Sequence, residues 1–253
     1  MDDTAAEIVR RVAAGERFAV GLLAHVQGSA PQKAGARLLV LPDGTMRGTV
    51  GGGCLEMETR RRALIALRTG EPALFDLRLD DDFGWDDGLI CGGRTTLLVS
   101  PHPGRMAGAL AEAGAARAEG RRALLATVLA APDPRAIGET VALPAESSGG
   151  AALPLPFVPE APVGEKPVVR ERDGWRVLVE PVRPDPALVV MGCGHIGTAL
   201  VALAAGAGFR VTAVDDRADY ANAARLPAAS RVICDDMLAA ARSIPSSSRA
   251  TYL

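Results

Sequence analysis

The sequence predicts an α/β protein built from two domains, and three observations along the chain support this fold class. Apolar strand-like runs alternate with helical patterns over residues 1–144, as in a mixed α/β domain. A stretch rich in Pro, Gly, Ala and Ser follows, "PAESSGGAALPLPFVPEAPVGEK", and this composition is typical of a loop or linker. The segment "MGCGHIGTAL" then places the spacing G-x-G-x-x-G between an apolar strand and a helix. We therefore expect a mixed α/β domain over 1–144, a linker and hairpin over 145–185, and a partial Rossmann-like βαβ domain over 186–253.

The elements of the first domain follow from local patterns. Apolar residues at helical spacing predict a helix over 4–14, and good helix formers predict two more over 56–67 and 106–121. Apolar runs bounded by turn residues predict strands over 18–26, 72–79, 95–101 and 123–130. A hairpin is expected over 36–50, with its turn at Asp43-Gly44.

The rest of the chain predicts a hairpin and then three parallel strands. The hairpin spans 167–182 and turns at Asp173-Gly174. Strands are expected over 187–192, 210–215 and 231–236, with a helix over 196–205 after the first of them. A doubly wound sheet has about six strands, so the predicted sheet is incomplete at its C-terminus and has an unpaired edge.

The composition indicates a soluble globular protein and excludes several classes of partner. Hydrophobic residues make up 48% of the 253 residues. The chain has 28 Lys and Arg and 30 Asp and Glu, and its basic residues form no continuous block. Nucleic acid and anionic membranes are therefore not expected partners. Neither a secretory signal nor a membrane span is predicted, because the N-terminus is acidic and the most apolar run is broken by glycines. The four cysteines, Cys54, Cys91, Cys193 and Cys234, form no CxxC pair, which favours a cytoplasmic protein with reduced thiols.

The glycine motif of the second domain has the context that a dinucleotide site requires. Gly192 permits a tight turn, Gly194 lets phosphates approach the backbone, and Gly197 lets helix and strand pack closely. Asp215 ends the next strand, where a ribose-binding carboxylate is expected. NAD(P) or another nucleotide is thus one expected ligand. The fold alone does not establish dehydrogenase chemistry.

Two further glycine segments lie in the first domain. In "GTVGGGCLE", Gly51, Gly52 and Gly53 suit a bent backbone that offers N–H groups to an anion, and Glu56 opens the helix that follows. A tight turn without a ligand is the alternative. In "LICGG", Cys91 precedes Gly92 and Gly93, and its thiol is either exposed and reactive or buried and inert.

Taken together, these motifs resemble the XdhC/CoxI family of xanthine dehydrogenase accessory proteins. The resemblance runs from about residue 6 to residue 235 and includes "GSAPQKAGARLLVLPDGTMRGTVGGGCLE", "LICGG" and "GCGHIGTALVALAAGAGFRVTAVDDRADYANAARLPAA". It implies an XdhC/CoxI-type domain over 1–144 and a chaperone rather than an enzyme. Such a protein binds molybdenum cofactor, protects it while a cysteine desulfurase supplies sulfur, and helps to insert it into a xanthine-dehydrogenase-type molybdenum hydroxylase.

The resemblance also suggests roles for individual residues. The loop of Gly51–Gly53 would hold the phosphate of the cofactor, and Cys91, with Gly92 and Gly93, would supply a soft ligand to molybdenum. Cys54 matches a family position, either as a ligand contact or as a small packing residue. His195 also matches, either orienting a ligand or capping its helix. Gln32, Lys33 and Arg37 are further candidates for contact with anionic groups, although solvated surface charge is favoured for Lys33.

The sequence departs from the family pattern after Asp236. The tail "MLAAARSIPSSSRATYL" allows at most one more helix, and we hypothesise that a frameshift or early stop replaced the family's C-terminus. The exposed sheet edge would then allow pairing with a second copy, as a homodimer. Two rival functions remain, an NAD(P)-dependent oxidoreductase and an interaction module that senses nucleotides or redox state.

Overall fold

The structure is a computed structural model that describes residues 3–28, 30–78, 93–144, 166–244 and 251–252. It contains two compact units, unit 1 over Met1–Arg183 and unit 2 over Pro184–Leu253. Both combine helices and sheets, so the predicted mixed α/β fold class is confirmed.

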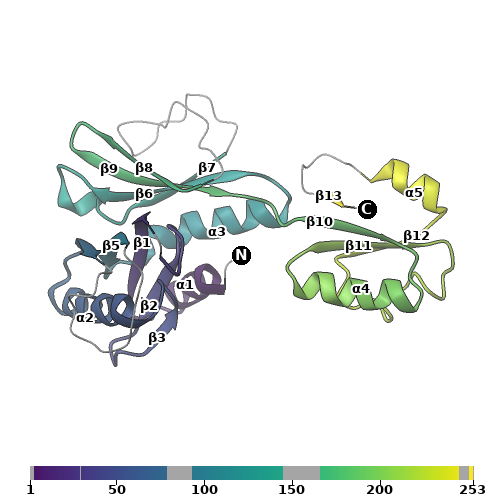
Figure 1. The fold of residues 1–253 in the computed structure, drawn as a ribbon, viewed down its shortest axis with the longest axis horizontal. Coiled ribbons are helices and arrows are strands. Elements are labelled where there is room, and N and C mark those ends of the chain that lie inside the picture. Colours follow the sequence, from purple (N-terminus) through teal and green to yellow (C-terminus); the bar gives the residue numbers. More distant parts are fainter. Residues whose placement is uncertain (1–2, 29, 79–92, 145–165, 245–250, 253) are drawn as a thin grey trace. The chain divides into compact units, whose positions relative to one another are not determined.

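An antiparallel sheet of five strands, in the order β3-β2-β1-β5-β4, forms the first layer of unit 1 (Figure 1). Its strands are β1 (Ala19–Gln27), β2 (Arg37–Val40), β3 (Met46–Gly48), β4 (Ala73–Arg78) and β5 (Arg94–Ser100). Helix α2 (Gly53–Thr69) covers one face, where Leu55 and Ala63 share a buried cluster with Leu23 and Leu97. This helix begins inside the glycine segment, which is earlier than the sequence predicts.

A second antiparallel sheet, in the order β7-β6-β9-β8, also belongs to unit 1. Its strands are β6 (Ala123–Ala130), β7 (Thr140–Pro144), β8 (Val168–Arg172) and β9 (Trp175–Val182), with a 3₁₀ turn at Pro134–Ala136. The expected hairpin is therefore present, but it does not stand in a separate connecting segment. Strand β9 pairs with β6, for example with Leu178 opposite Thr127. Main-chain hydrogen bonds therefore join the hairpin to the rest of unit 1.

The other helices of unit 1, α1 (Asp3–Ala13) and α3 (Gly104–Ala118), share a core with both sheets. Ile8 of α1 and Met106 of α3 are buried together with Leu39 of the first sheet and Leu125 of the second. Burial of large apolar side chains removes them from water and is the main stabilising contribution to this layered arrangement.

Unit 2 is a parallel sheet in the order β12-β11-β10-β13. The strands are β10 (Ala187–Met191), β11 (Arg210–Asp215), β12 (Arg231–Cys234) and β13 (Thr251–Tyr252); the helices are α4 (His195–Gly206) and α5 (Met237–Ser243). Val190 and Val201 pack on the α4 side, and Val189 and Ala240 pack on the α5 side. The sequence predicts a sheet with an unpaired edge. In the structure, Thr251 and Tyr252 of β13 pair with Ala187 and Leu188 of β10.

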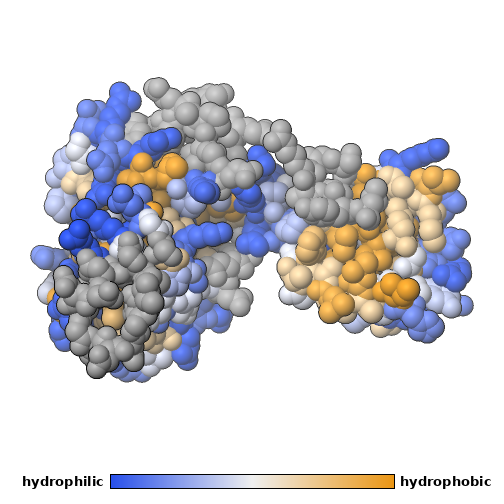
Figure 2. All heavy atoms as spheres, viewed as in Figure 1, coloured by the Kyte–Doolittle hydropathy of each residue, from blue (hydrophilic) through white to orange (hydrophobic). Residues whose placement is uncertain are grey.

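Helix α4 presents an apolar surface on its outer side. Ile196 is 85% exposed and Leu203 is 74% exposed, with Leu200 between them, and Figure 2 shows the corresponding hydrophobic patch over this helix. No Asp, Glu, Lys or Arg occurs along α4. None of the described helices, α4 included, is long and apolar enough to cross a bilayer.

Candidate functional site

The glycine loop of unit 1 connects β3 to α2 and depends on glycine for its backbone shape. Gly51, Gly52 and Gly53 have φ angles of 132°, 78° and 54°, in the region that L side chains rarely adopt. The sharp bend that the sequence predicts here is present. Cys54 and Glu56 follow in the first turn of α2, so the structure brings these five predicted residues together.

Two N–H groups of this loop, those of Gly51 and Gly52, are engaged by the chain itself. Gly51 N donates to Thr49 Oγ1 at 3.1 Å, and Gly52 N donates to Glu56 Oε1 at 3.1 Å. The Thr49 hydroxyl also donates to Glu56. A carboxylate of the chain therefore occupies the position at the helix N-terminus where the sequence led us to expect a ligand anion. A Glu inside the first turn is a capping signal that could have predicted this contact.

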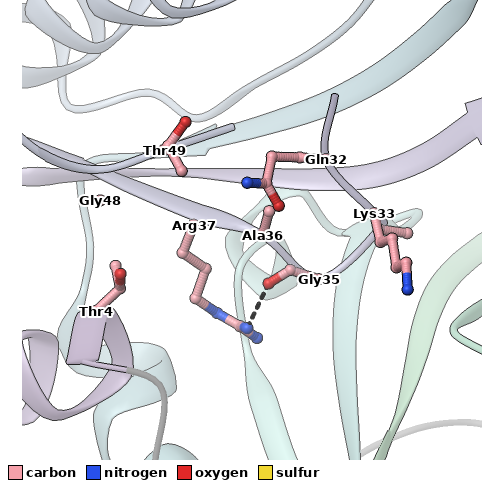
Figure 3. Close-up of a pocket in the computed structure, with 9 residues that line it drawn as sticks. Thr4, Gln32, Lys33, Gly35, Ala36, Arg37, Gly48 and Thr49 are labelled. Carbon is pink, nitrogen blue, oxygen red and sulfur yellow. Dashed lines mark hydrogen bonds between the residues drawn. The ribbon is translucent and has the colours of Figure 1, made fainter. Parts of the chain in front are cut away.

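A cavity of about 320 Å³ lies beside the glycine loop. Its lining residues are Thr4, Gln32, Lys33, Ala34, Gly35, Ala36, Arg37, Gly48 and Thr49, shown in Figure 3. Thr49 belongs both to the cavity and to the hydrogen bonds of the loop. The two segments are adjacent, because a Cβ built on Gly51 would lie 3.6 Å from Cδ of Pro31. The cavity and the loop therefore form one candidate site.

Arg37 forms part of the cavity wall and is only 7% exposed. Its Nη1 and Nη2 atoms donate to the two carboxylate oxygens of Glu180 at 3.1 and 2.7 Å, and Nη1 also donates to the carbonyl of Gly35 at 2.7 Å. The Nε–H group is buried and has no acceptor among the described residues. Nothing local in the sequence indicates Glu180, which lies in β9, far from Arg37 along the chain.

Of the two cysteines predicted near this site, the structure describes Cys54 but not Cys91. Cys54 is half-buried in the first turn of α2 and forms no disulfide. Cys91 and Gly92 lie outside the described residues. Gly93 is buried immediately before β5. The predicted contact between Cys91 and molybdenum thus remains a prediction.

In unit 2, the glycine motif connects β10 to α4. Gly192 has a φ angle of 93° and forms the expected tight turn. A Cβ on Gly197 would lie 1.9 Å from the carbonyl oxygen of Gly192, whereas a Cβ on Gly194 would meet no atom within 4 Å. Gly197 is therefore required for close packing of the helix on the loop, and the space beside Gly194 is open.

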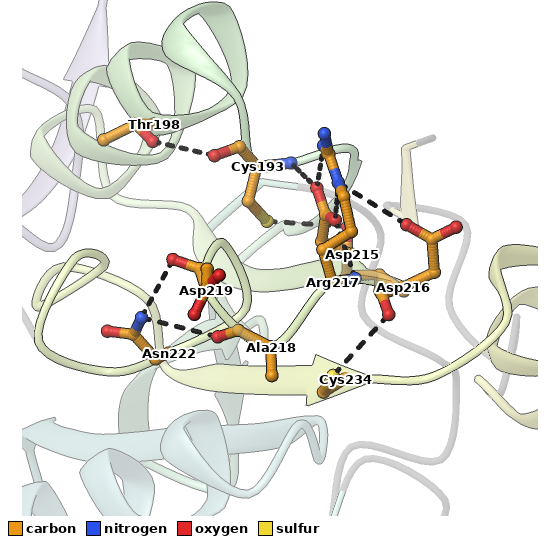
Figure 4. A network of polar contacts seen from close by, with 10 residues as sticks. Cys193, Thr198, Asp215, Asp216, Arg217, Ala218, Asp219, Asn222 and Cys234 are labelled. Carbon is orange, nitrogen blue, oxygen red and sulfur yellow. Dashed lines mark hydrogen bonds and ion pairs between the residues drawn. The ribbon is translucent and has the colours of Figure 1, made fainter.

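Asp215 is fully buried at the end of β11 and holds this loop in place (Figure 4). Its carboxylate accepts hydrogen bonds from Cys193 N at 2.7 Å, from Arg217 N at 3.0 Å, and from Arg217 Nε and Nη2 at 2.9 and 3.0 Å. The hydrogen bonds from the Arg217 side chain are the main reason that the pKa of Asp215 is well below its usual value. A ribose contact by Asp215 would require Arg217 to release the carboxylate.

His195 and Cys193 flank the same loop. His195 is the exposed first residue of α4, and the helix is preceded by Gly194 without a side-chain cap, so the capping role considered for His195 is not realised. Burial, with a smaller contribution from the charge of Asp215, raises the pKa of the Cys193 thiol, which keeps it protonated. Within the described part of the chain, no group of three or more His, Cys, Asp or Glu side chains could hold a metal ion.

Two family matches cover separate parts of the chain. Residues 11–78 match the XdhC and CoxI family, and residues 188–251 match the XdhC Rossmann domain. The first match contains the glycine loop and most of the cavity lining; the second contains the glycine motif and Asp215. The resemblance inferred from the motifs is thereby confirmed.

Relatives and a solved structure agree with these matches. A protein of Bacillus subtilis (strain 168), named as a probable xanthine dehydrogenase subunit, is 26% identical over 231 residues, covering 86% of this chain and 65% of that protein. The uncharacterized protein YqeB of Escherichia coli (strain K12) is 34% identical over 85 residues, 34% of this chain and 16% of YqeB. The chain thus spans less than two thirds of either relative.

The crystal structure of a xanthine dehydrogenase from Bacillus halodurans has a TM-score of 0.66 at 21% identity, over 95% of this chain and 71% of that one. At this identity, the likeness shows that the two proteins share a fold.

Proposed function

Because this chain belongs to the XdhC and CoxI family, we propose that it is an accessory protein of a xanthine-dehydrogenase-type molybdenum hydroxylase. In this role it binds molybdenum cofactor as its cargo, protects the cofactor during sulfuration, and helps to insert it into the enzyme. The name of the Bacillus subtilis relative supports a partner of the xanthine dehydrogenase type. A cysteine desulfurase that supplies the sulfur is the second proposed partner.

The observation that carries this proposal is the position of the cavity beside the glycine loop, inside the part of the chain that matches the family. Gln32 and Lys33 offer amide and ammonium donors there, and Arg37 offers its Nε–H, unpaired within the described part of the chain. The cargo carries a phosphate and a pterin ring rich in hydrogen-bonding groups, so a donor-lined cavity fits its chemistry. The open space of about 320 Å³ is within the usual range for small-molecule sites.

The metal end of the cargo requires a different kind of ligand. Thiolates are soft donors and suit metals bound to sulfur. Cys91 is the proposed molybdenum contact on the basis of the family motif alone. Cys54, half-buried at the start of α2, is a second candidate because it lies next to the glycine loop.

An anaerobic binding assay tests the proposal. The purified chain is mixed with free molybdenum cofactor and passed through a sizing column, and molybdenum and pterin are measured in the protein peak. We expect co-elution near one cofactor per chain, weakened by Cys91→Ala. Cys234→Ala is the matched control, because Cys234 is an exposed thiol of unit 2. Absence of co-elution from a folded protein would contradict the proposal.

Nucleotide binding by unit 2 is a second candidate function, favoured by the open space beside Gly194 at the start of α4. It would make the chain a nucleotide-sensing interaction module or, with added turnover, an NAD(P)-dependent oxidoreductase. Titration with NADH and NADPH, monitored by nicotinamide fluorescence, distinguishes these functions. Binding without turnover would favour the sensing module, and turnover with a substrate would favour the oxidoreductase.

A further inference from the structure

The residues that line the cavity beside the glycine loop include two basic side chains, Lys33 and Arg37. None of its lining residues is Asp or Glu, and each polar side chain in its wall carries at least one hydrogen-bond donor. Arg37 is neutralised by Glu180, whereas Lys33 is exposed and has no ion-pair partner among the described residues. The wall of the cavity therefore has a net positive charge, supplied by Lys33.

Arg37 adds a donor that the fold leaves unused. The side chain is more than nine-tenths buried, and its Nε–H meets no acceptor in the described part of the chain. A buried donor without an acceptor is unfavourable, so a ligand oxygen that reached this N–H from the cavity would remove that cost. The planar fork of Nη1 and Nη2 is already filled by the carboxylate of Glu180.

The donors that remain free therefore belong to three separate side chains and not to one planar fork. A planar carboxylate ligand is bound best by two parallel N–H groups, and those groups of Arg37 are engaged. Separate donors from Lys33, from Gln32 and from Arg37 Nε suit a tetrahedral group that carries several acceptor oxygens. Figure 3 shows Gln32, Lys33 and Arg37 among the side chains that line the cavity.

The neighbouring loop does not compete for the same anion. Gly51 and Gly52 donate their N–H groups to Thr49 and Glu56, so these two donors of the predicted anion nest are satisfied within the chain. The Glu56 carboxylate lies in the first turn of α2, where the helix dipole favours a negative charge, and it accepts a hydrogen bond from the Thr49 hydroxyl. An incoming anion would consequently find these two N–H groups already engaged, whereas Lys33 in the cavity wall has no ion-pair partner among the described residues.

We infer that this cavity is a phosphate-monoester site, in which Lys33, Gln32 and the Nε–H of Arg37 bind the phosphate. The inference deepens the proposed function and rests on it for the identity of the cargo, since the phosphate would be that of the pterin cofactor. The phosphate contact thereby moves from Gly51–Gly53, where the sequence placed it, to the neighbouring segment of Gln32–Arg37. Gly51 then lies next to the site, beside Pro31.

The chain offers a matched control, because Lys33 and Lys166 are its only two lysines. Inorganic phosphate is titrated into the full chain at constant ionic strength, and binding is measured by calorimetry. We expect saturable binding that Lys33→Gln and Gln32→Leu each weaken by roughly tenfold, the loss typical of one charge-assisted or polar contact. Lys166→Gln should leave the affinity unchanged, because Lys166 is exposed and lies outside the cavity.

A second measurement avoids any effect of substitution on folding. The unmodified protein is treated with an acetylating reagent, with and without phosphate, and the two lysines are followed by mass spectrometry. We expect phosphate to slow acetylation of Lys33 and to leave Lys166 unaffected. Equal rates at Lys33 with and without phosphate, or undiminished phosphate affinity in Lys33→Gln, would overturn the inference.

The two proposals can fail separately. Cofactor uptake that is unaltered by Lys33→Gln would refute the phosphate site and leave the accessory function intact. Phosphate binding through Lys33 without any cofactor uptake would refute the accessory function and leave an anion site in unit 1.

Discussion

Gly194 and Gly197 belong to one motif, yet a methyl group would meet opposite surroundings at the two positions. At Gly197 it would overlap the carbonyl oxygen of Gly192, at 1.9 Å, and at Gly194 it would enter open space. Gly194 also has a φ angle of −67°, which any residue adopts. Gly197 is therefore needed by the fold of unit 2, and Gly194 leaves room for a ligand.

Substitution of these glycines should separate the two roles. We expect Gly197→Ala to lower the free energy of unfolding of unit 2 by about 3 kcal/mol or more, because overlap with backbone cannot be relieved by a side-chain rotation. Gly194→Ala should change it by less than about 0.5 kcal/mol. Urea unfolding of both variants is the measurement, and equal stabilities would show that the predicted overlap is relieved.

Asp215 should make the stability of unit 2 depend on pH. Hydrogen bonds from Arg217 hold the folded-state pKa below the unfolded value near 3.9. The ionised carboxylate therefore stabilises the fold fully above about pH 4, and this contribution is lost as the pH falls below the unfolded value. Asp215→Asn should lose this pH dependence and cost on the order of 2 kcal/mol at pH 7.

Urea unfolding of the wild-type chain and of Asp215→Asn between about pH 7 and pH 3 checks this expectation. The difference between the two proteins should shrink as the solution is acidified. A constant difference over this range would mean that Asp215 is not the titrating group.

At the scale of elements, one ion pair joins the two sheets of unit 1. Arg37 lies in β2 of the first sheet and Glu180 in β9 of the second, and both are buried. Breaking one partner of a buried pair leaves an uncompensated charge, which costs about 3–5 kcal/mol. We therefore expect Glu180→Gln to destabilise unit 1 by about that amount.

A double substitution provides the control for this pair. Arg37→Met with Glu180→Met replaces both charges by apolar side chains of similar length and should recover most of the lost stability. Chemical denaturation of the single and double variants gives the comparison. A double variant no more stable than Glu180→Gln would show that the loss comes from packing.

Most helices and strands were predictable because each carries its own local pattern. Strand β6, for example, coincides with the apolar run of Ala123–Ala130. Strand β7 was missed because it is short and ends in a proline, and β13 was missed because its two residues follow a Ser-rich stretch. The hairpin of β8 and β9 was expected, but its pairing with β6 was not, since a local alternation does not specify a distant partner.

For the whole molecule, the family and the positions of both glycine segments could be predicted from the sequence, because these motifs are contiguous. The group that binds the N–H of the first glycine loop could not be predicted. The sequence indicates that Gly52 offers an N–H group, but only the fold shows that Glu56 accepts it. The pairing of Arg37 with Glu180 likewise depends on two sheets that meet only in the folded chain.

The two units contain different kinds of candidate site. Unit 1 contains the donor-lined cavity, and unit 2 contains a Rossmann domain whose acidic residue is already paired. Cargo binding is accordingly expected in unit 1, with unit 2 open to a nucleotide. This division predicts that Gly194→Ala leaves cofactor binding unchanged while Lys33→Gln weakens it.

Delivery of the cofactor is the decisive property of an accessory protein. The measurement is anaerobic transfer from the cofactor-loaded chain to a cofactor-free molybdenum hydroxylase of the xanthine dehydrogenase type, followed as molybdenum gained and activity restored. We expect the loaded chain to restore activity faster, and with less cofactor lost, than an equal amount of free cofactor. Activation no better than that by free cofactor, from a chain that demonstrably binds it, would contradict the accessory role.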